Sequence, residues 1–153
     1  MDADDKPPNS VLFACGLNSL RSPMAAHLFG HLIGPSVPVR SAGVQKADLD
    51  PFAVAAMAEI GLDIGDHRPV TFEELEDLEG LDFDLIVTLA PEAHHRALEL
   101  THRLAVAIEY WPTADPTAME GNREQRLDAY REVRDMLMQR IKTRFGWHRG
   151  GNE

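Results

Sequence analysis

Four short apolar runs along the chain alternate with segments in which apolar residues recur every three or four positions. Short runs rich in branched aliphatic residues are typical of buried β-strands. The spacing of three and four is typical of helices that turn one face towards a core. We therefore expect strands at 10–15, 37–43, 83–90 and 104–111, and helices at 22–33, 50–61, 71–78, 91–100 and 122–145.

Local signals support several of these boundaries. Ser22 is placed to cap the first helix, and Pro23 fits its first turn. Asp50 and Pro51 start the second helix, which Gly61 ends. The long last helix presents a core face of residues spaced three and four apart: Leu127, Tyr130, Val133, Leu137 and Ile141.

The alternation of strands and helices determines the expected architecture. Such strands pair in parallel, so we expect a three-layer α/β sandwich, with a four-stranded parallel sheet and helices on both faces. The sequence has no internal repeat and no linker long enough to separate two domains. We expect a disordered leader at 1–9, a single domain at 10–146 and a flexible tail at 147–153. Ligands of such sheets bind at the carboxyl ends of the strands.

Composition narrows the class of function. The chain has 153 residues, of which 44% are hydrophobic and 26% charged, and its formal net charge is -10. This acidity argues against binding to nucleic acids or to anionic membrane surfaces. No apolar run is long enough to cross a bilayer and the first residues lack a secretory pattern, so we expect a cytoplasmic protein. The sole cysteine, Cys15, excludes an internal disulfide and a cysteine-rich metal site.

That cysteine ends the first predicted strand, in the stretch FACGLNSLRSP (13–23). A loop between a strand and a helix start turns amides inward and gains the partial positive charge of the helix, which favours an anion and a thiolate. Arg21 adds a planar charge suited to a tetrahedral oxyanion. The loop lacks the Gly-Lys-Ser/Thr end of a nucleotide-binding phosphate loop. A small oxyanion is therefore the expected ligand.

Plainer explanations exist for some of these residues. A lone cysteine at a strand end is usually a small buried hydrophobe, but its spacing to Arg21, followed by Ser-Pro, favours a site. Asp115, which precedes a proline, is read alone as a turn or helix start. His94, His95 and His102 do not have the spacing of a usual zinc site, and we expect neither a metal nor a cofactor.

Taken together, these segments resemble the low-molecular-weight protein tyrosine phosphatases and the related thioredoxin-type arsenate reductases. VLFACGLNSLRSPMAAHLF (11–29) is similar to the opening strand, Cys-x5-Arg-Ser loop and Pro-Met-Ala helix start of that family. The segments that follow in the family's order are RSAG (40–43), DPFAVAAMAEIGLDIGDHRP (50–69), FDLIVTLAPEAHH (83–95) and WPTADP (111–116). The resemblance implies a phosphotyrosine phosphatase I-like fold with the flavodoxin-like strand order 2-1-3-4.

The resemblance also implies roles for individual residues. Cys15 would be the nucleophile that forms a phosphocysteine, Arg21 would hold the equatorial oxygens, and Asp115 would protonate the leaving oxygen and then activate water. The phosphate-binding loop would comprise Gly16, Leu17, Asn18, Ser19, Leu20, Arg21 and Ser22. The residues that brace it would be Asn18, Ser22, Ser41 and His67.

The implied activity is metal-independent hydrolysis of phosphomonoesters, either phosphotyrosine or small aryl phosphates. The expected partner is a phosphorylated protein or a small phosphomonoester. Inorganic phosphate, vanadate and arsenate are the expected oxyanion ligands.

Three departures from the family pattern qualify this activity. Leu17 stands where the family usually has glycine, so the loop either tolerates leucine or differs in shape. Gly16 and Ser19 replace bulky residues beside the substrate slot, and neither VQKADLD (44–50) nor TAMEG (117–121) contains an aromatic, which predicts weak selectivity for phosphotyrosine. TLAPEAHHRAL (88–98) lacks the two further cysteines of the reductase relay. Two alternatives therefore stay open: a single-cysteine arsenate reductase that uses an external thiol, and a phosphate-binding module without turnover.

Overall fold

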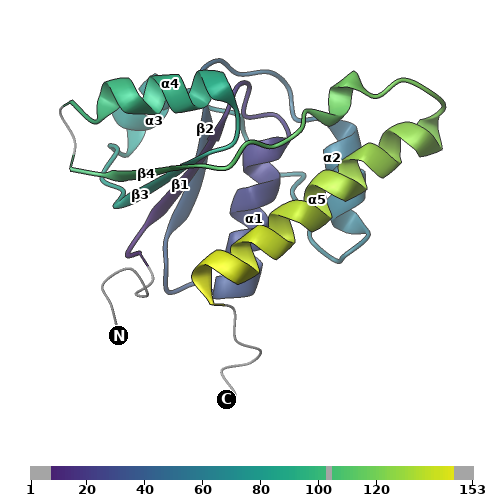
Figure 1. Ribbon diagram of the computed structural model, residues 1–153, viewed down its shortest axis with the longest axis horizontal. Helices are drawn as coiled ribbons and strands as arrows, with labels where there is room; N and C mark the ends of the chain where they lie inside the picture. The colour runs from purple at the N-terminus through teal and green to yellow at the C-terminus, as the bar shows by residue number, and fades with distance from the viewer. Residues whose placement is uncertain (1–7, 103–104, 147–153) are drawn as a thin grey trace.

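The sheet at the centre of the molecule has four parallel strands in the order β2-β1-β3-β4 (Figure 1). The computed structural model describes residues 8–102 and 105–146. The strands are β1 (Val11–Cys15), β2 (Val39–Gly43), β3 (Leu85–Thr88) and β4 (Ala107–Tyr110). The predicted sheet and its order are confirmed, although each strand is shorter than the apolar run that predicted it.

Five α-helices and one 3-10 turn lie between the strands or after the last of them, within the described residues. The helices are α1 (Arg21–Ile33), α2 (Pro51–Ala58), α3 (Phe72–Leu78), α4 (Pro91–Leu100) and α5 (Arg123–Phe145). The 3-10 turn, η2 (Pro116–Ala118), follows β4 and was not expected from the sequence. In the described part of the chain, no helix has the length and apolar character needed to cross a bilayer.

The helices divide between the two faces of the sheet (Figure 1). Successive side chains of a strand point to opposite faces. Val11, Phe13 and Cys15 of β1 accordingly join one buried cluster with α1, α2 and α5. Leu12 and Ala14 join the other cluster with α3 and α4. The two clusters enclose the sheet, which confirms the expected three-layer sandwich.

The predicted capping residue is confirmed for α2 and wrong for α1. Asp50 caps α2 by accepting a hydrogen bond from the backbone N–H of Phe52 at 2.8 Å. Ser22 does not cap α1, because the helix begins one residue earlier, at Arg21, and the capping position is Leu20. The Ser22 side chain is buried and bonded to other partners. The predicted tail and residues 1–7 of the predicted leader lie outside the described residues.

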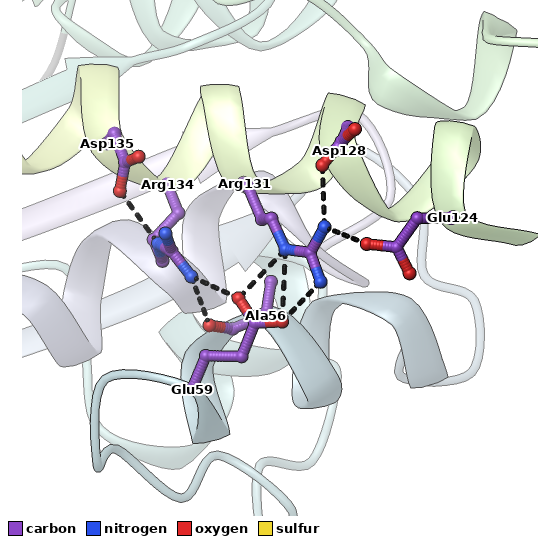
Figure 2. A network of polar contacts seen from close by, with 7 residues as sticks. All are labelled: Ala56, Glu59, Glu124, Asp128, Arg131, Arg134 and Asp135. Atoms are coloured by element: carbon purple, nitrogen blue, oxygen red, sulfur yellow. Dashed lines mark hydrogen bonds and ion pairs between the residues drawn. The ribbon is translucent and has the colours of Figure 1, made fainter.

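The last helix is held against α2 by a network of charged side chains (Figure 2). All five residues of its predicted core face are buried. Arg134 donates to the carbonyl of Ala56 at 2.7 Å and to the carboxylate of Glu59 at 2.9 Å. Arg131 donates to the same carboxylate at 2.6 Å. The hydrogen bonds from Arg131 and Arg134 lower the pKa of Glu59 to about 2.

Candidate active site

The loop between β1 and α1 takes its shape from a second segment, 44–50. The backbone carbonyls of Cys15, Gly16, Leu17 and Ser19 accept hydrogen bonds of 2.9 to 3.2 Å from N–H groups of that segment. In a trans peptide the C=O and N–H groups point in opposite directions. The N–H groups that share these peptides therefore face the other side of the loop. A concave set of amides at the start of a helix is suited to an anion.

Cys15 lies at the start of this loop and is only 2% exposed. The backbone N–H of Asn18 donates to its sulfur at 3.3 Å, and the Ser22 hydroxyl oxygen lies 2.9 Å from the same sulfur. That hydroxyl accepts a hydrogen bond from Asn18 Nδ2, and its own proton can point at the sulfur or at the carbonyl of Ala42, 3.5 Å away. The Cys15 sulfur therefore has one backbone donor and one hydroxyl group within hydrogen-bond distance.

Asn18 joins the loop to three other parts of the molecule. It is fully buried and has a φ of 55°, a left-handed conformation that asparagine tolerates better than most residues. Its Nδ2 donates to the hydroxyls of Ser22 and Ser41 at 2.9 Å each. Its Oδ1 accepts the backbone N–H of Val70 at 2.8 Å and lies 3.2 Å from His67 Nε2. The structure thus brings together the four residues predicted to brace the loop.

His67 approaches Asn18 with a donated proton. Its Nε2 lies 3.2 Å from both the backbone carbonyl and the Oδ1 of Asn18, and both of these atoms are acceptors. Nε2 therefore carries the proton. Burial lowers the pKa of His67, the hydrogen bond to Asn18 opposes that change, and the nearby His27 adds to it. The neutral imidazole is the form that the site favours.

Leu17 and Gly16 fit the loop for different reasons. Among the described residues, the non-glycine residue with a positive φ is Asn18 and not Leu17, so leucine causes no backbone strain at its position. The Leu17 side chain is 44% exposed. A Cβ added to Gly16 would lie 2.8 Å from Oε2 of Glu92, in the first turn of α4. Glu92 is therefore a neighbour of the loop that the sequence analysis missed.

Arg21 and Asp115 are connected by the segment that follows β4, which contains both Asp115 and the hydrogen-bond partner of Arg21. Arg21 donates to the backbone carbonyl of Thr113 at 3.0 Å. Asp115 accepts at Oδ1 from the N–H of Thr117 at 3.0 Å and from its hydroxyl at 2.7 Å, which caps η2. Burial alone would raise the pKa of Asp115, but the bonds from Thr117 and the charge of Arg21 outweigh it and the pKa is lowered. Oδ2 has no hydrogen-bond partner among the described residues, so a turn role leaves one oxygen for chemistry.

A cavity of about 400 Å³ opens between the loop and η2, with Ser19 and Thr117 in its walls. Phe52 of α2 and Tyr130 of α5 also line it, with their rings stacked 5.3 Å apart. The Arg126 guanidinium lies 4.7 Å from the centre of the Phe52 ring. Aromatic side chains therefore reach this side of the site from α2 and α5, and not from segments 44–50 and 117–121. The position of Phe52, directly after segment 44–50 and its Asp-Pro, is the signal that could have found it.

The histidines considered as metal ligands have other surroundings. His94 stacks on Tyr110 with ring centres 4.5 Å apart and bonds to the Thr88 hydroxyl at 3.0 Å. His95 and His102 are exposed. Across residues 8–102 and 105–146, no group of three His, Cys, Asp or Glu side chains is arranged to hold a metal ion.

The sequence and the fold of this chain are similar to those of known proteins. The family model "Low molecular weight phosphotyrosine protein phosphatase" matches residues 10–146. An arsenate reductase of Shouchella clausii is 36% identical over 137 residues, covering 86% of this chain and 91% of its own. The low molecular weight protein tyrosine phosphatase of T. tengcongensis superposes with a TM-score of 0.70 at 28% identity, over 87% of this chain and 95% of that one. An arsenate reductase in a phosphate-binding state gives 0.68 at 25% identity, over 90% and 96%. On the match across residues 10–146 and the identity of the curated relative, the chain belongs to the low molecular weight phosphotyrosine protein phosphatase family.

Proposed function

We propose that the protein hydrolyses phosphomonoesters through a phosphocysteine on Cys15. The observation that carries the proposal is the surroundings of that sulfur, which has a backbone N–H donor and a serine hydroxyl within hydrogen-bond distance, in a loop whose amides face one side. A buried cysteine that served only packing would need neither of these polar contacts. Arg21 begins the adjoining helix and contacts the segment that bears Asp115.

The proposed reaction uses these groups in two steps. The Cys15 thiolate attacks phosphorus, and the bond from phosphorus to the ester oxygen breaks as Asp115 gives that oxygen a proton. The loop amides and Arg21 stabilise the charge on the equatorial oxygens. Water then attacks the phosphocysteine while Asp115 accepts its proton, which releases phosphate and restores the thiolate.

The lowered pKa of Asp115 predicts how the rate of hydrolysis depends on pH. An acid must hold its proton when the ester bond breaks, and the lowered pKa makes the protonated form a minor species at neutral pH. Hydrolysis is therefore expected to become faster as the pH falls from neutral to mildly acidic values. Asp115→Asn should remove this dependence and lower kcat by about 10² to 10⁴.

The test measures hydrolysis of p-nitrophenyl phosphate and of a phosphotyrosine peptide in the presence of a chelator. Wild type is compared with Cys15→Ser and Asp115→Asn, and Asp77→Asn serves as a control that removes an exposed carboxylate from α3. We expect vanadate-sensitive turnover that Cys15→Ser abolishes and Asp77→Asn leaves unchanged. A rate that survives Cys15→Ser would overturn the proposal. Oxyanion binding without turnover would instead support a binding module.

The curated relatives support a second candidate, reduction of arsenate. The relative from Shouchella clausii is named an arsenate reductase. The chain has a single cysteine, so an external thiol must take part. Cys15 would displace water from arsenic, and the external thiol would attack the Cys15 sulfur. The electron pair of the sulfur–arsenic bond would leave with arsenic as arsenite, and a second thiol would reduce the mixed disulfide.

The same samples separate the two candidates. Arsenate is added with a small thiol, or with a glutaredoxin or thioredoxin system, and thiol oxidation is followed in wild type and Cys15→Ser. Arsenate-dependent oxidation that requires Cys15 would favour the reductase. Phosphate release without such oxidation would favour the phosphatase.

A further inference from the structure

A second cavity, of about 630 Å³, lies at the open edge of the sheet beside β2. Its walls come from α1, β2, α3 and the segment that carries His67. It is distinct from the cavity that faces η2, because the two share no lining residue.

The charged side chains of this cavity are mostly basic. His27 and His31 lie four residues apart on α1, so they share one face of that helix. Arg40 is paired with Glu79, the sole carboxylate among the lining residues, at 2.9 Å. Arg68 has no hydrogen-bond or ion-pair partner within the described residues. With the histidines neutral, the two arginines and one carboxylate of the lining have a net charge of +1, in a chain whose formal net charge is -10.

The tautomers of the histidines decide which of them can donate to a ligand. His27 Nδ1 lies 2.9 Å from the carbonyl of Pro23, an acceptor, so Nδ1 carries the proton and Nε2 of the neutral ring is an acceptor. His67 gives its Nε2 proton to Asn18. Arg68 and His31 are therefore the donors that this cavity offers to an anion.

The remaining wall of the cavity is apolar. Leu62, Val70 and Leu75 contribute to it, and Leu78 at its rim is 74% exposed. A volume in this range is typical of sites for small organic molecules. The fitting ligand therefore has an anionic group and an apolar body.

Two residues of the cavity wall also contact the Cys15 loop. His67 and Ser41 both hydrogen-bond to Asn18, whose backbone N–H donates to the Cys15 sulfur. A ligand that moves the His67 ring, or changes its charge, therefore alters the hydrogen bonds from His67 to Asn18. Coupling of this kind must be reciprocal between the two sites.

We propose that this cavity binds a small organic anion with an apolar body, held by Arg68 and His31, and that its occupancy changes oxyanion binding at the Cys15 loop through His67 and Asn18. The binding half does not depend on the reaction proposed above. The coupling half depends only on the loop holding an oxyanion.

The binding test uses 1-anilinonaphthalene-8-sulfonate as the probe, with a chelator present. The probe is titrated by fluorescence into wild type, Arg68→Gln and Arg140→Gln, the last removing the same charge from α5. We expect Arg68→Gln to weaken binding about tenfold, the loss of one charge-assisted hydrogen bond, and Arg140→Gln to change it less than about twofold. In NMR spectra the ring signals of His27, His31 and His67 should shift on saturation, and that of His95 should not. Equal affinity in Arg68→Gln and wild type, or shifts confined to other residues, would overturn the site.

The coupling test measures the affinity of vanadate for the Cys15 loop with and without saturating probe. We expect a change of at least about threefold, near the lower end of typical allosteric coupling, and its loss in His67→Gln. An unchanged vanadate affinity, with probe binding that Arg68→Gln weakens, would keep the site and refute the coupling. Hydrolysis measured without probe tests the proposed function separately.

Discussion

Asn18→Ala should destabilise the fold and the Cys15 loop together. The asparagine is fully buried, and its side chain makes hydrogen bonds to Ser22, Ser41 and Val70. The substitution removes all of these bonds and leaves the left-handed backbone at a residue with a Cβ. The serine hydroxyls can rotate towards other acceptors. The backbone N–H of Val70 cannot, and it loses its partner.

The expected loss of stability follows from these two effects. A non-glycine residue in the left-handed region costs about 1–2 kcal/mol, and asparagine already bears part of this cost, so the substitution adds only the remainder. A part-buried donor left unpaired costs about 1–3 kcal/mol. Together these effects lower the free energy of unfolding by about 1–4 kcal/mol, a large part of the roughly 5–15 kcal/mol typical of a domain. Asn18→Gly relieves the backbone strain but not the lost bonds, so it should be about 1 kcal/mol more stable than Asn18→Ala.

The assay is urea unfolding at neutral pH, followed by far-UV circular dichroism. Variants are compared where the slope of the free energy of unfolding against urea concentration is the same as in wild type. Asn122→Ala provides the scale, because Asn122 caps α5 and the loss of such a cap costs about 1 kcal/mol. Turnover of p-nitrophenyl phosphate is measured on the same samples. If Asn18→Ala costs less than Asn122→Ala and matches Asn18→Gly, the described bonds do not hold the loop and the reasoning fails.

Three further perturbations test other parts of the structure. Gly43→Ala should lower the free energy of unfolding by about 1–3 kcal/mol and should also lower kcat/KM. The reason is that the added Cβ would lie 2.4 Å from the Gln45 carbonyl and 2.8 Å from the Asn18 nitrogen. Normal turnover would contradict this packing. Phe52→Ala should raise KM for aryl phosphates about fivefold and leave KM for alkyl phosphates nearly unchanged, and equal effects on both would show that the ring does not meet the substrate. Glu59, whose pKa falls from 4.5 to about 2 on bonding to Arg131, stabilises the fold above its ordinary pKa, and the benefit is lost as the pH falls towards 2. The difference in melting temperature between wild type and Glu59→Gln should therefore shrink below pH 4.5, and a constant difference would refute the linkage.

The two central strands could be predicted from the sequence because each is an apolar run buried on both faces: all residues of β1 and β3 are buried. The outer strands β2 and β4 are only partly buried, and their place in the alternation of strands and helices supports their prediction. The strand ends were less predictable. Leu89 and Ala90 continue the apolar run beyond β3 and are just as buried, so hydrophobicity alone does not reveal where the ladder stops. Ser22 shows a similar ambiguity. A serine before a proline signals a helix cap, and only the proximity of Asn18 and Cys15 in space assigns its hydroxyl elsewhere.

The residues of the candidate site are likewise of two kinds: those that a local sequence signal reveals, and those that only the fold brings close to them. Cys15 and Arg21 are close in sequence, so their spacing on a strand-to-helix turn is a local signal that needs no tertiary information. Thr113, which anchors Arg21, is 92 residues away from it, and no periodicity connects the two. Phe52 belongs to a helix whose pattern predicts only burial. Such residues become visible once the sheet order places the ends of β1 and β4 at the same edge.

The network in Figure 2 bears on the site through α2. At the end of this helix, Glu59 is held by Arg131 and Arg134 of α5. At its start, Asp50 donates its N–H to the carbonyl of Ser19 in the Cys15 loop at 2.9 Å and accepts the hydroxyl of Tyr130 of α5 at 2.6 Å. The helix is thus fixed to α5 at both ends and to the loop at one. Because the loop amides keep their orientation only while the carbonyls of the loop are bonded to segment 44–50, we expect a weakened contact between α2 and α5 to disturb the Cys15 loop through Asp50 and Ser19.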